Sequence, residues 1–192
     1  MNTPAHIAAS LLTWRNETSR HAAWAVTLGA VLPDAPMYVF YAVQKLRGTA
    51  EREIWSIEYY RDSWQLFFDL FNSIPLALLA IAVGVRMKNR MVQLVAQSSL
   101  LHLLLDLPVH HDDGHRHFLP FSHWRFESPI SYWDPDHHGR EFMVLELLAA
   151  IIACLWVCRR SPDSGMRRMA TATLGLYALG LTIVGVIVLS RA

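Results

Sequence analysis

Long apolar runs separated by polar segments are the main feature of the chain. Four of them approach the ~20 residues that a membrane-spanning helix requires: Trp64 to Val85, Met91 to Val109, Glu141 to Cys158 and Met169 to Ser190. The apolar residues are nearly continuous over these runs and do not recur at the short intervals of a soluble fold. The pattern therefore predicts four spanning helices.

The first residues of the chain predict a different arrangement. The apolar stretch Pro4 to Trp14 is too short to span a bilayer, and a second one, His21 to Leu32, follows after the polar segment Arg15 to Arg20. We expect a helical hairpin that turns at Arg15 to Arg20.

Two prolines follow the hairpin. Pro33 and Pro36 each remove a backbone donor and disfavour the helical conformation of the preceding residue. We therefore expect a break there, after which a helix continues from Met37 to Leu46. Asp34, between the prolines, is placed to cap that helix.

The composition agrees with a membrane protein. Of the 192 residues 53% are hydrophobic and 17% are charged, and this length fits one domain with one core. We expect a single all-α domain, a multi-pass membrane helical bundle with an N-terminal helical hairpin, four longer spanning helices and a histidine-rich extramembrane loop. Its parts are residues 1–46 (hairpin and following helix), 64–109 (two spanning helices), 110–140 (loop) and 141–192 (two spanning helices).

The basic residues predict the topology. If the helices alternate in direction, the short basic turns all fall on one face, and short loops rich in Lys and Arg stay in the cytoplasm. These turns contain Arg15 and Arg20, then Arg86, Lys88 and Arg90, then Arg159, Arg160, Arg167 and Arg168. The long connections 43–63 and 110–140 then lie on the opposite face, which is extracytoplasmic in a bacterium.

The charge and the cysteines argue against other classes of protein. The net charge is +1 and no stripe of Lys and Arg is present, so nucleic acid is not an expected partner. Cys154 and Cys158 lie four residues apart in an apolar run, a spacing that gives neither a disulfide framework nor a two-pair zinc motif.

One loop concentrates the histidines. Seven of the ten lie between His110 and His138, and imidazole with carboxylate is the usual ligand set of catalytic zinc, manganese or iron. The same stretch holds the carboxylates Asp112, Asp113, Glu127, Asp134 and Asp136, of which Asp113 is a candidate ligand. The alternative is a solvated histidine-rich surface loop, but the aromatic residues and prolines of this stretch favour packing.

A second signal lies inside an apolar run. His102 and Asp106 are four residues apart and therefore share one face of a helix. Ionisable residues in membrane segments are costly and tend to face a cavity, a partner or an ion; a helix-helix hydrogen bond is the alternative. Pro108 should end the helix just beyond Asp106, which places the pair at the mouth of the histidine loop.

A third pair repeats this spacing. His137 and Glu141 can project together from the first turn of the next helix. Metal ligation is one interpretation, and the ordinary preference for charge at a helix start is the other. Glu146, deeper in the same helix, is a further ligand or a partner of one.

The hairpin supplies further candidates. In antiparallel short helices His6 and Asp34 come to the same end in space, on the side of the loop. Asp69, near the start of the next long helix, lies at the same level. We expect these residues to converge with His102 and Asp106.

Several short motifs occur in a recognisable order. Residues 1–6 read MNTPAH, 29–34 read GAVLPD, 102–106 read HLLLD and 119–122 read LPFS. In this order they resemble the membrane-bound metal-dependent hydrolases, a family that includes LexA-regulated inner-membrane proteins, over most of the chain from His6 to about Gly139. The resemblance implies a divalent metal, hydrolysis and an inner-membrane location, with no assigned substrate.

More distantly, the order of ligand types is similar to that of the zinc-dependent phospholipase C. That similarity implies a ligand set of His6, Asp34, His102, Asp106, one of His110, His111 or His115, and His137 with Glu141. Many members of the membrane-bound hydrolase family that the motifs resemble have His-Ser where this chain has Asn72-Ser73. Either that metal position is lost, or Asp69 supplies the ligand.

The function favoured by these residues is metal-dependent hydrolysis of a phosphoester or similar bond in a lipid or amphipathic substrate. One to three divalent ions, with Zn²⁺ favoured over Mn²⁺ or Fe²⁺, would lower the pKa of water toward ~7. Asp34, Asp106 or a loop carboxylate is the candidate general base, and His115 or His117 can steady the leaving group. The alternatives are a non-catalytic metal-binding or transport protein and a family member whose site has decayed. Membrane lipid is the expected partner, and the oligomeric state stays open.

Overall fold

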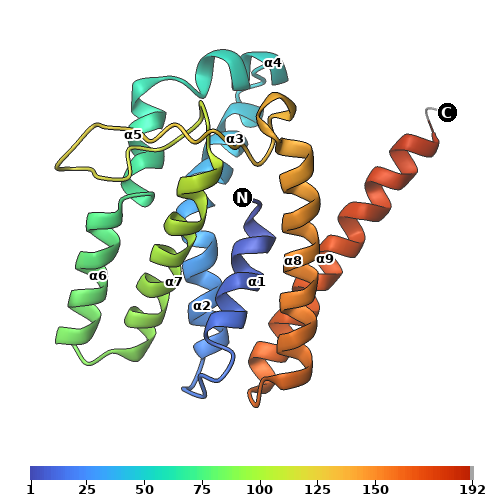
Figure 1. The fold of residues 1–192 in the computed structure, drawn as a ribbon. Coiled ribbons are helices and arrows are strands. Elements are labelled where there is room, and N and C mark those ends of the chain that lie inside the picture. The colour runs from blue at the N-terminus through green and yellow to red at the C-terminus, as the bar shows by residue number, and fades with distance from the viewer. Residues whose placement is uncertain (191–192) are drawn as a thin grey trace.

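The computed structural model describes residues 1–190, which form an all-helical fold with 72% helix and no strand in that range. This confirms the all-α prediction (Figure 1). The helices are α1 (Thr3–Thr13), α2 (Ala22–Val31), α3 (Ala35–Leu46), α4 (Glu51–Glu53), α5 (Asp62–Phe71), α6 (Ile74–Arg86), α7 (Arg90–Asp106), α8 (Gly139–Arg160) and α9 (Ser164–Leu189). Short 3₁₀ turns at Leu32–Asp34, Leu107–Val109 and Pro135–His137 and a π-helical turn at Ile54–Glu58 complete the set.

Four helical segments are long and apolar enough to cross a membrane: Ala22–Leu46, Asp62–Arg86, Arg90–Val109 and Gly139–Arg160. The last three contain three of the spans expected from the sequence. The fourth expected span, Met169 to Ser190, lies mostly in α9, and its membrane crossing stays a prediction. Residues 191 and 192 of the last expected segment lie outside the described residues.

The break expected at the two prolines takes the form of a 3₁₀ turn, Leu32–Asp34, which separates α2 from α3. Pro33 lies at the start of this turn and Pro36 at the start of α3, and proline is tolerated in a first helical turn because its missing N–H is least needed there. The chain therefore passes from α2 to α3 with a change of helix type only, and Ala22–Leu46 counts as one segment of 25 residues. Asp34 makes no side-chain cap on α3, so its carboxylate is free for other partners.

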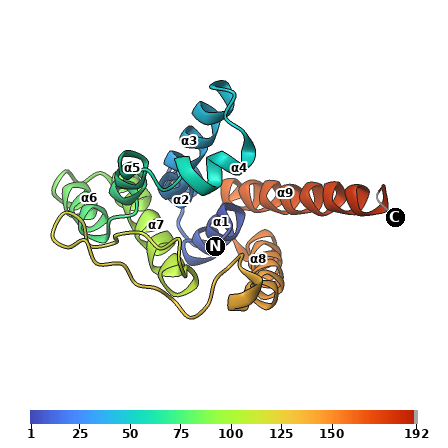
Figure 2. The ribbon, with the colours of Figure 1, turned by 90° about the horizontal axis from the view of Figure 1, so that it is seen from above.

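The predicted N-terminal hairpin is confirmed, since α1 ends at Thr13 and α2 begins at Ala22. Seen along the bundle, α1 lies between α2 and α7 on one side and α8 on the other (Figure 2). Its buried face includes small residues such as Ala5 and Ala8, which allow neighbouring helices to approach closely. The end of α9 projects away from the bundle (Figures 1 and 2).

An aromatic cluster covers the end of the bundle where α3, α5 and the connection between them meet. Phe40, Ile54, Tyr59 and Phe68 are its buried members. The long loop after α7 crosses the same end (Figure 1). The start of α1, the end of α7 and the histidine loop are thus brought together at this end.

Candidate metal centre

Three buried residues from two helices form a group that can hold a metal ion. His6 of α1 and His102 and Asp106 of α7 each offer a ligand atom, and these atoms lie within 4.8 Å of one another. His6 Nε2 lies 3.0 Å from Asp106 Oδ1, and His102 Nε2 lies 2.9 Å from Asp106 Oδ2. The two imidazole rings stack at 3.5 Å between centroids, with 8° between their planes. Within residues 1–190 this is the one such group of three.

Local helical geometry explains why α7 contributes two of the three. His102 and Asp106 lie on one face because they are four residues apart, and α7 ends at Asp106, followed by a 3₁₀ turn that contains Pro108. The position of the pair at the end of its helix, as expected from Pro108, is confirmed. His6 and His102 have no exposed surface and Asp106 is 3% exposed.

The hydrogen bond of His102 to the backbone fixes the state of its ring. His102 Nδ1 lies 2.7 Å from the carbonyl oxygen of Ala30, an acceptor, so Nδ1 carries the proton and Nε2 of the neutral ring carries a lone pair. That lone pair faces the carboxylates of Asp106 at 2.9 Å and Asp34 at 3.5 Å. A lone pair facing two carboxylates needs a positive charge between them, which is either a second proton on the ring or a bound cation.

The unpartnered nitrogens fit a cation well. Both ring nitrogens of His6 and Nε2 of His102 are buried without a partner in hydrogen-bond geometry among the described residues. Buried polar atoms of this kind are rare and costly unless something satisfies them. Two imidazole nitrogens and a carboxylate are a donor set for zinc, manganese or iron, and a backbone carbonyl bonded to the other ring nitrogen is the usual way to orient such a ligand.

Asp34 lies beside this group without being part of it. The 3₁₀ turn between α2 and α3 places its Oδ1 3.5 Å from His102 Nε2. Its Oδ2 accepts a hydrogen bond of 2.5 Å from Thr3 Oγ1, and Thr3 in turn lies 2.5 Å from the Tyr38 hydroxyl. Asp34 is therefore held by α1 and α3 with one oxygen toward the histidines.

The first histidine of the loop reaches the same group. His110 Nε2 lies 3.5 Å from Asp106 Oδ1, and its Nδ1 lies 3.1 Å from Asp113 Oδ2. Burial lowers the pKa of His110, but the carboxylates of Asp106 and Asp113 outweigh it and raise that pKa to about 9. The amino group of Met1 lies 2.5 Å from Asp106 Oδ1 and 3.5 Å from His110 Nε2.

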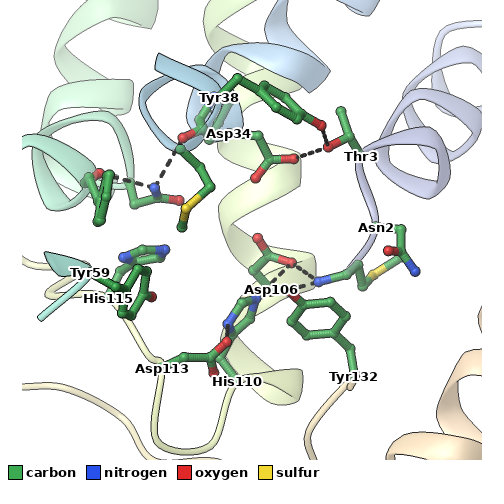
Figure 3. A pocket seen from close by; sticks show the side chains of 15 residues that line it. Asn2, Thr3, Asp34, Tyr38, Tyr59, Asp106, His110, Asp113, His115 and Tyr132 are labelled. Atoms are coloured by element: carbon green, nitrogen blue, oxygen red, sulfur yellow. Dashed lines mark hydrogen bonds and ion pairs between the residues drawn. The ribbon is translucent and has the colours of Figure 1, made fainter. Parts of the chain in front are cut away.

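A polar cavity of about 210 Å³ opens beside these residues (Figure 3). Asp34, Asp106, His110, Asp113 and His115 are among the residues that line it. Tyr38, Tyr59 and Tyr132 are the hydroxyl-bearing aromatic residues among its other walls. The cavity gives a small molecule access to both Asp34 and Asp106.

Asp69 lies outside the group and has a different partner. It is fully buried, it pairs with the Arg116 Nε, and its Oδ1 accepts the Arg116 backbone N–H at 3.0 Å. His115 Nδ1 lies 3.3 Å from the same oxygen. A carboxylate whose oxygens are taken by a guanidinium and a backbone amide is already neutralised. Asp69 therefore fastens the histidine loop to α5.

Asp69→Asn is expected to loosen the loop without removing a metal ligand. Loss of the charged hydrogen bonds should lower the free energy of unfolding by about 1.5–3 kcal/mol. Faster hydrogen exchange across residues 110–131 should accompany it, while the metal content per chain stays unchanged. Asp62→Asn, an exposed carboxylate on the same helix, serves as the control. Loss of metal from the Asp69 variant with the loop still protected would instead make Asp69 a ligand.

The pair His137 and Glu141 does not form as expected. Helix α8 begins only at Gly139, and His138 before it has a positive φ of 63°, so the helical spacing of four does not apply. His137 Nδ1 contacts Asp134 Oδ2 at 2.7 Å, and its ring stacks on His111 at 3.7 Å. Glu141 is exposed in the first turn of α8. The structure thus places His111 and His137 in a separate pair.

Glu146 and Asn72 are buried, and both bind backbone. Glu146 accepts hydrogen bonds from the Asn2 side chain at 2.7 Å and from the Asn2 N–H at 3.2 Å, which holds the start of α1. Asn72 Nδ2 donates to the carbonyl oxygens of Pro33 at 3.3 Å and Phe68 at 3.0 Å. It therefore ties the end of α5 to the turn that carries Asp34.

Three partners in the site were not predicted from the sequence. The carbonyl of Ala30 has no side-chain signature, so its bond to His102 could not be read from the sequence. Thr3 and Tyr38 carry hydroxyls, but only the fold brings them to Asp34. The two prolines beside Asp34 predicted a turn at that position. They did not indicate which side chains Asp34 would contact.

No protein-family model, curated protein or solved structure matches this chain. The fold and the site therefore define its class by themselves. It is an all-helical protein with four helices able to cross a membrane and a buried His/Asp group that can hold a metal ion.

Proposed function

We propose that this protein is a membrane-bound metal-dependent hydrolase that acts on a phosphoester or similar bond in an amphipathic substrate. The observation that carries the proposal is the His102 ring, whose Nε2 faces two carboxylates beside a polar cavity. A site for structure alone would need no cavity of this kind next to it. The motif order described above supports the same class.

The ligands in this proposal are His6, His102 and Asp106, with His110 beside them. The donor set favours Zn²⁺, with Mn²⁺ or Fe²⁺ as alternatives, and a single group of three supports one ion rather than three. A divalent cation held there would supply Lewis acidity, since it lowers the pKa of water toward ~7 and polarises a phosphoryl oxygen.

The remaining residues divide the other roles. Asp106 contacts both histidines and is committed to the ligand group. Asp34 is not, and its Oδ1 accepts no hydrogen bond from the described residues, with His102 Nε2 3.5 Å away, so we assign it the role of general base. His115 also lines the cavity, with its Nδ1 3.3 Å from Asp69 Oδ1, and we assign it the role of steadying the leaving group.

The location at one end of the bundle supports an amphipathic substrate. Four helical segments can cross a bilayer, and the cavity lies beside the end of α7, while Asp34 and Tyr38 line it from the middle of the Ala22–Leu46 segment. The end of a spanning helix lies near the level of the lipid headgroups. We place the site on the extracytoplasmic face of an inner membrane, because the basic turns lie at the opposite ends of the helices.

Turnover of a phosphodiester probe tests the proposal. The purified protein, loaded with Zn²⁺ in detergent micelles, should hydrolyse bis(p-nitrophenyl) phosphate. Asp34→Asn should lower kcat by about 10²- to 10⁴-fold, the usual contribution of a general base, and should keep the bound metal. Asp112→Asn, an exposed carboxylate of the loop, should leave kcat unchanged.

Two results would speak against the enzyme. A protein that holds its metal but hydrolyses neither this probe nor phospholipids is a non-catalytic metal-binding protein. Equal kcat values for the Asp34 variant and the wild type would remove Asp34 from the mechanism.

A further inference from the structure

A second cavity adjoins the metal centre, and aromatic rings form most of its wall. It has a volume of about 290 Å³, and Trp55, Tyr59, Tyr60, Tyr132 and Trp133 line it together with Asp113. We call it the aromatic cavity. Tyr59, Tyr132 and Asp113 also line the cavity beside the metal centre, so the two cavities are adjacent.

Asp113 lines this cavity and has one carboxylate oxygen without a partner among the described residues. Its Oδ2 lies 3.1 Å from His110 Nδ1 and accepts a hydrogen bond from Trp133 Nε1 at 3.0 Å. Its Oδ1 is buried and has no hydrogen-bond partner in the described part of the chain. A buried carboxylate oxygen is costly to leave without a partner. A positively charged group in the cavity would be attracted to this carboxylate.

The aromatic rings are held in place without closing the cavity. The Trp55 Nε1 donates to Glu51 Oε1 at 2.8 Å, and Tyr59 packs edge-on against Tyr60 with 4.9 Å between centroids. Trp55, Tyr60 and Trp133 are 43%, 52% and 52% exposed, so the cavity has an open rim. A ligand can enter without rearrangement of the bundle.

The residues that line the cavity carry negative charge only, and His110 contacts Asp113 from outside this lining. Of the described residues that line it, Asp113 is charged and none is Lys or Arg. Rings of Trp and Tyr attract cations through their electron-rich faces, and cages of such rings are the usual recognition site for alkylated ammonium groups. An aromatic wall with a carboxylate and no basic residue is therefore complementary to a small organic cation.

We propose that the aromatic cavity binds an alkylammonium group of the substrate while the bond to be cleaved lies beside the metal centre. The inference deepens the proposed function and rests on it for the cleavage step. It names the substrate class as an amphiphile with an amine or quaternary ammonium head. Binding of the cation itself depends only on the cavity.

Choline binding, measured without any turnover, tests the cavity. Choline should bind the purified full-length protein in maltoside micelles, as followed by the fluorescence of tryptophan or by calorimetry. Its neutral isostere 3,3-dimethylbutan-1-ol, with the same shape and no charge, should bind at least about tenfold more weakly. Equal binding of the two probes, or no binding of choline, overturns the proposal.

Three variants locate the binding. Asp113→Asn should weaken choline binding about tenfold or more, because the unpaired oxygen loses its charge. Tyr60→Leu, which removes a half-exposed ring that makes no side-chain hydrogen bond among the described residues, should weaken it about three- to tenfold. Trp124→Leu, a 55% exposed ring outside the cavity, is the control. Unchanged choline binding in both Asp113→Asn and Tyr60→Leu contradicts the assignment.

Two further measurements identify the source of the ammonium group and test the choline site independently of the proposed function. Phosphatidylcholine nanodiscs that compete with free choline, where phosphatidylglycerol nanodiscs do not, point to a lipid headgroup, and equal choline affinity in both points to a soluble amine. His102→Ala protein without metal should still bind choline. If this variant binds choline and the wild type shows no turnover, the proposed function is contradicted and the choline site is supported. If the wild type shows turnover but no choline binding, the choline site is contradicted and the proposed function is supported.

Discussion

Replacement of His102 by alanine is expected to remove the bound metal. The change deletes a ligand nitrogen and the bond from Nδ1 to Ala30 that orients it. The loss of affinity should exceed the about 10–100-fold that removal of an orienting partner alone costs. Metal content after dialysis, measured by inductively coupled plasma mass spectrometry, should fall from one ion per chain to near zero. Asp106→Asn should have the same effect, and both should abolish turnover.

The matched control is another histidine. His123→Ala changes an exposed residue of the loop and should retain the full metal content. Thermal unfolding gives a second readout, since a ligand at 100 times its Kd stabilises the folded state by about 2.7 kcal/mol. A chelator should therefore lower the Tm of the wild type and of the His123 variant, and should not change that of the His102 variant.

The same measurement decides between the two positive charges that the site can accept. If His102 carries a second proton in place of a bound ion, the wild type holds no metal and a chelator leaves its Tm unchanged. His102→Ala would then still destabilise the protein, because the carboxylates of Asp106 and Asp34 would lose their cationic neighbour. That outcome contradicts the proposed metal centre but not the description of the fold.

Contacts set by a single helix were predictable from the sequence. His102 and Asp106 share a face because the period of an α-helix is fixed, and Pro108 ends α7 where proline chemistry requires. His6 and Asp34 were placed near them because a short antiparallel hairpin brings its two ends together. These four residues do lie close to one another.

Contacts that depend on where a helix starts were not predictable. His137 and Glu141 have the same spacing as His102 and Asp106, but Gly139 begins α8 between them, so the first of the pair lies in a different type of turn. The partner of Asp69 was not predictable for another reason. Its partner Arg116 lies 47 residues away, and no periodicity in the sequence indicates which charge a distant loop will bring to a buried carboxylate.

The close approach of α2 and α7 gives the second large expected effect. Three side chains of α7 contact carbonyl oxygens of α2: Ser98 Oγ donates to Val26 at 2.6 Å, Ser99 Oγ donates to Gly29 at 2.9 Å, and His102 Nδ1 lies 2.7 Å from Ala30. This approach requires glycine at position 29, because a Cβ there would lie 2.2 Å from the carbonyl oxygen of Val95. The orientation of His102 therefore depends on a residue that carries no chemistry of its own.

Gly29→Ala is expected to destabilise the fold and weaken metal binding together. The added methyl must push α7 away from α2, and overpacking of this kind costs about 1–3 kcal/mol of unfolding free energy. Displacement of the Ala30 carbonyl from His102 should lower metal affinity by about 10–100-fold. Gly175→Ala in α9 is the control, because a Cβ there meets no described atom within 4 Å, and alanine should be neutral or stabilise the helix by up to about 1 kcal/mol. Metal titrations and denaturant unfolding of both variants measure the two effects. A Gly29 variant that loses stability but binds metal with wild-type affinity would show that the orientation of His102 does not depend on this helix contact.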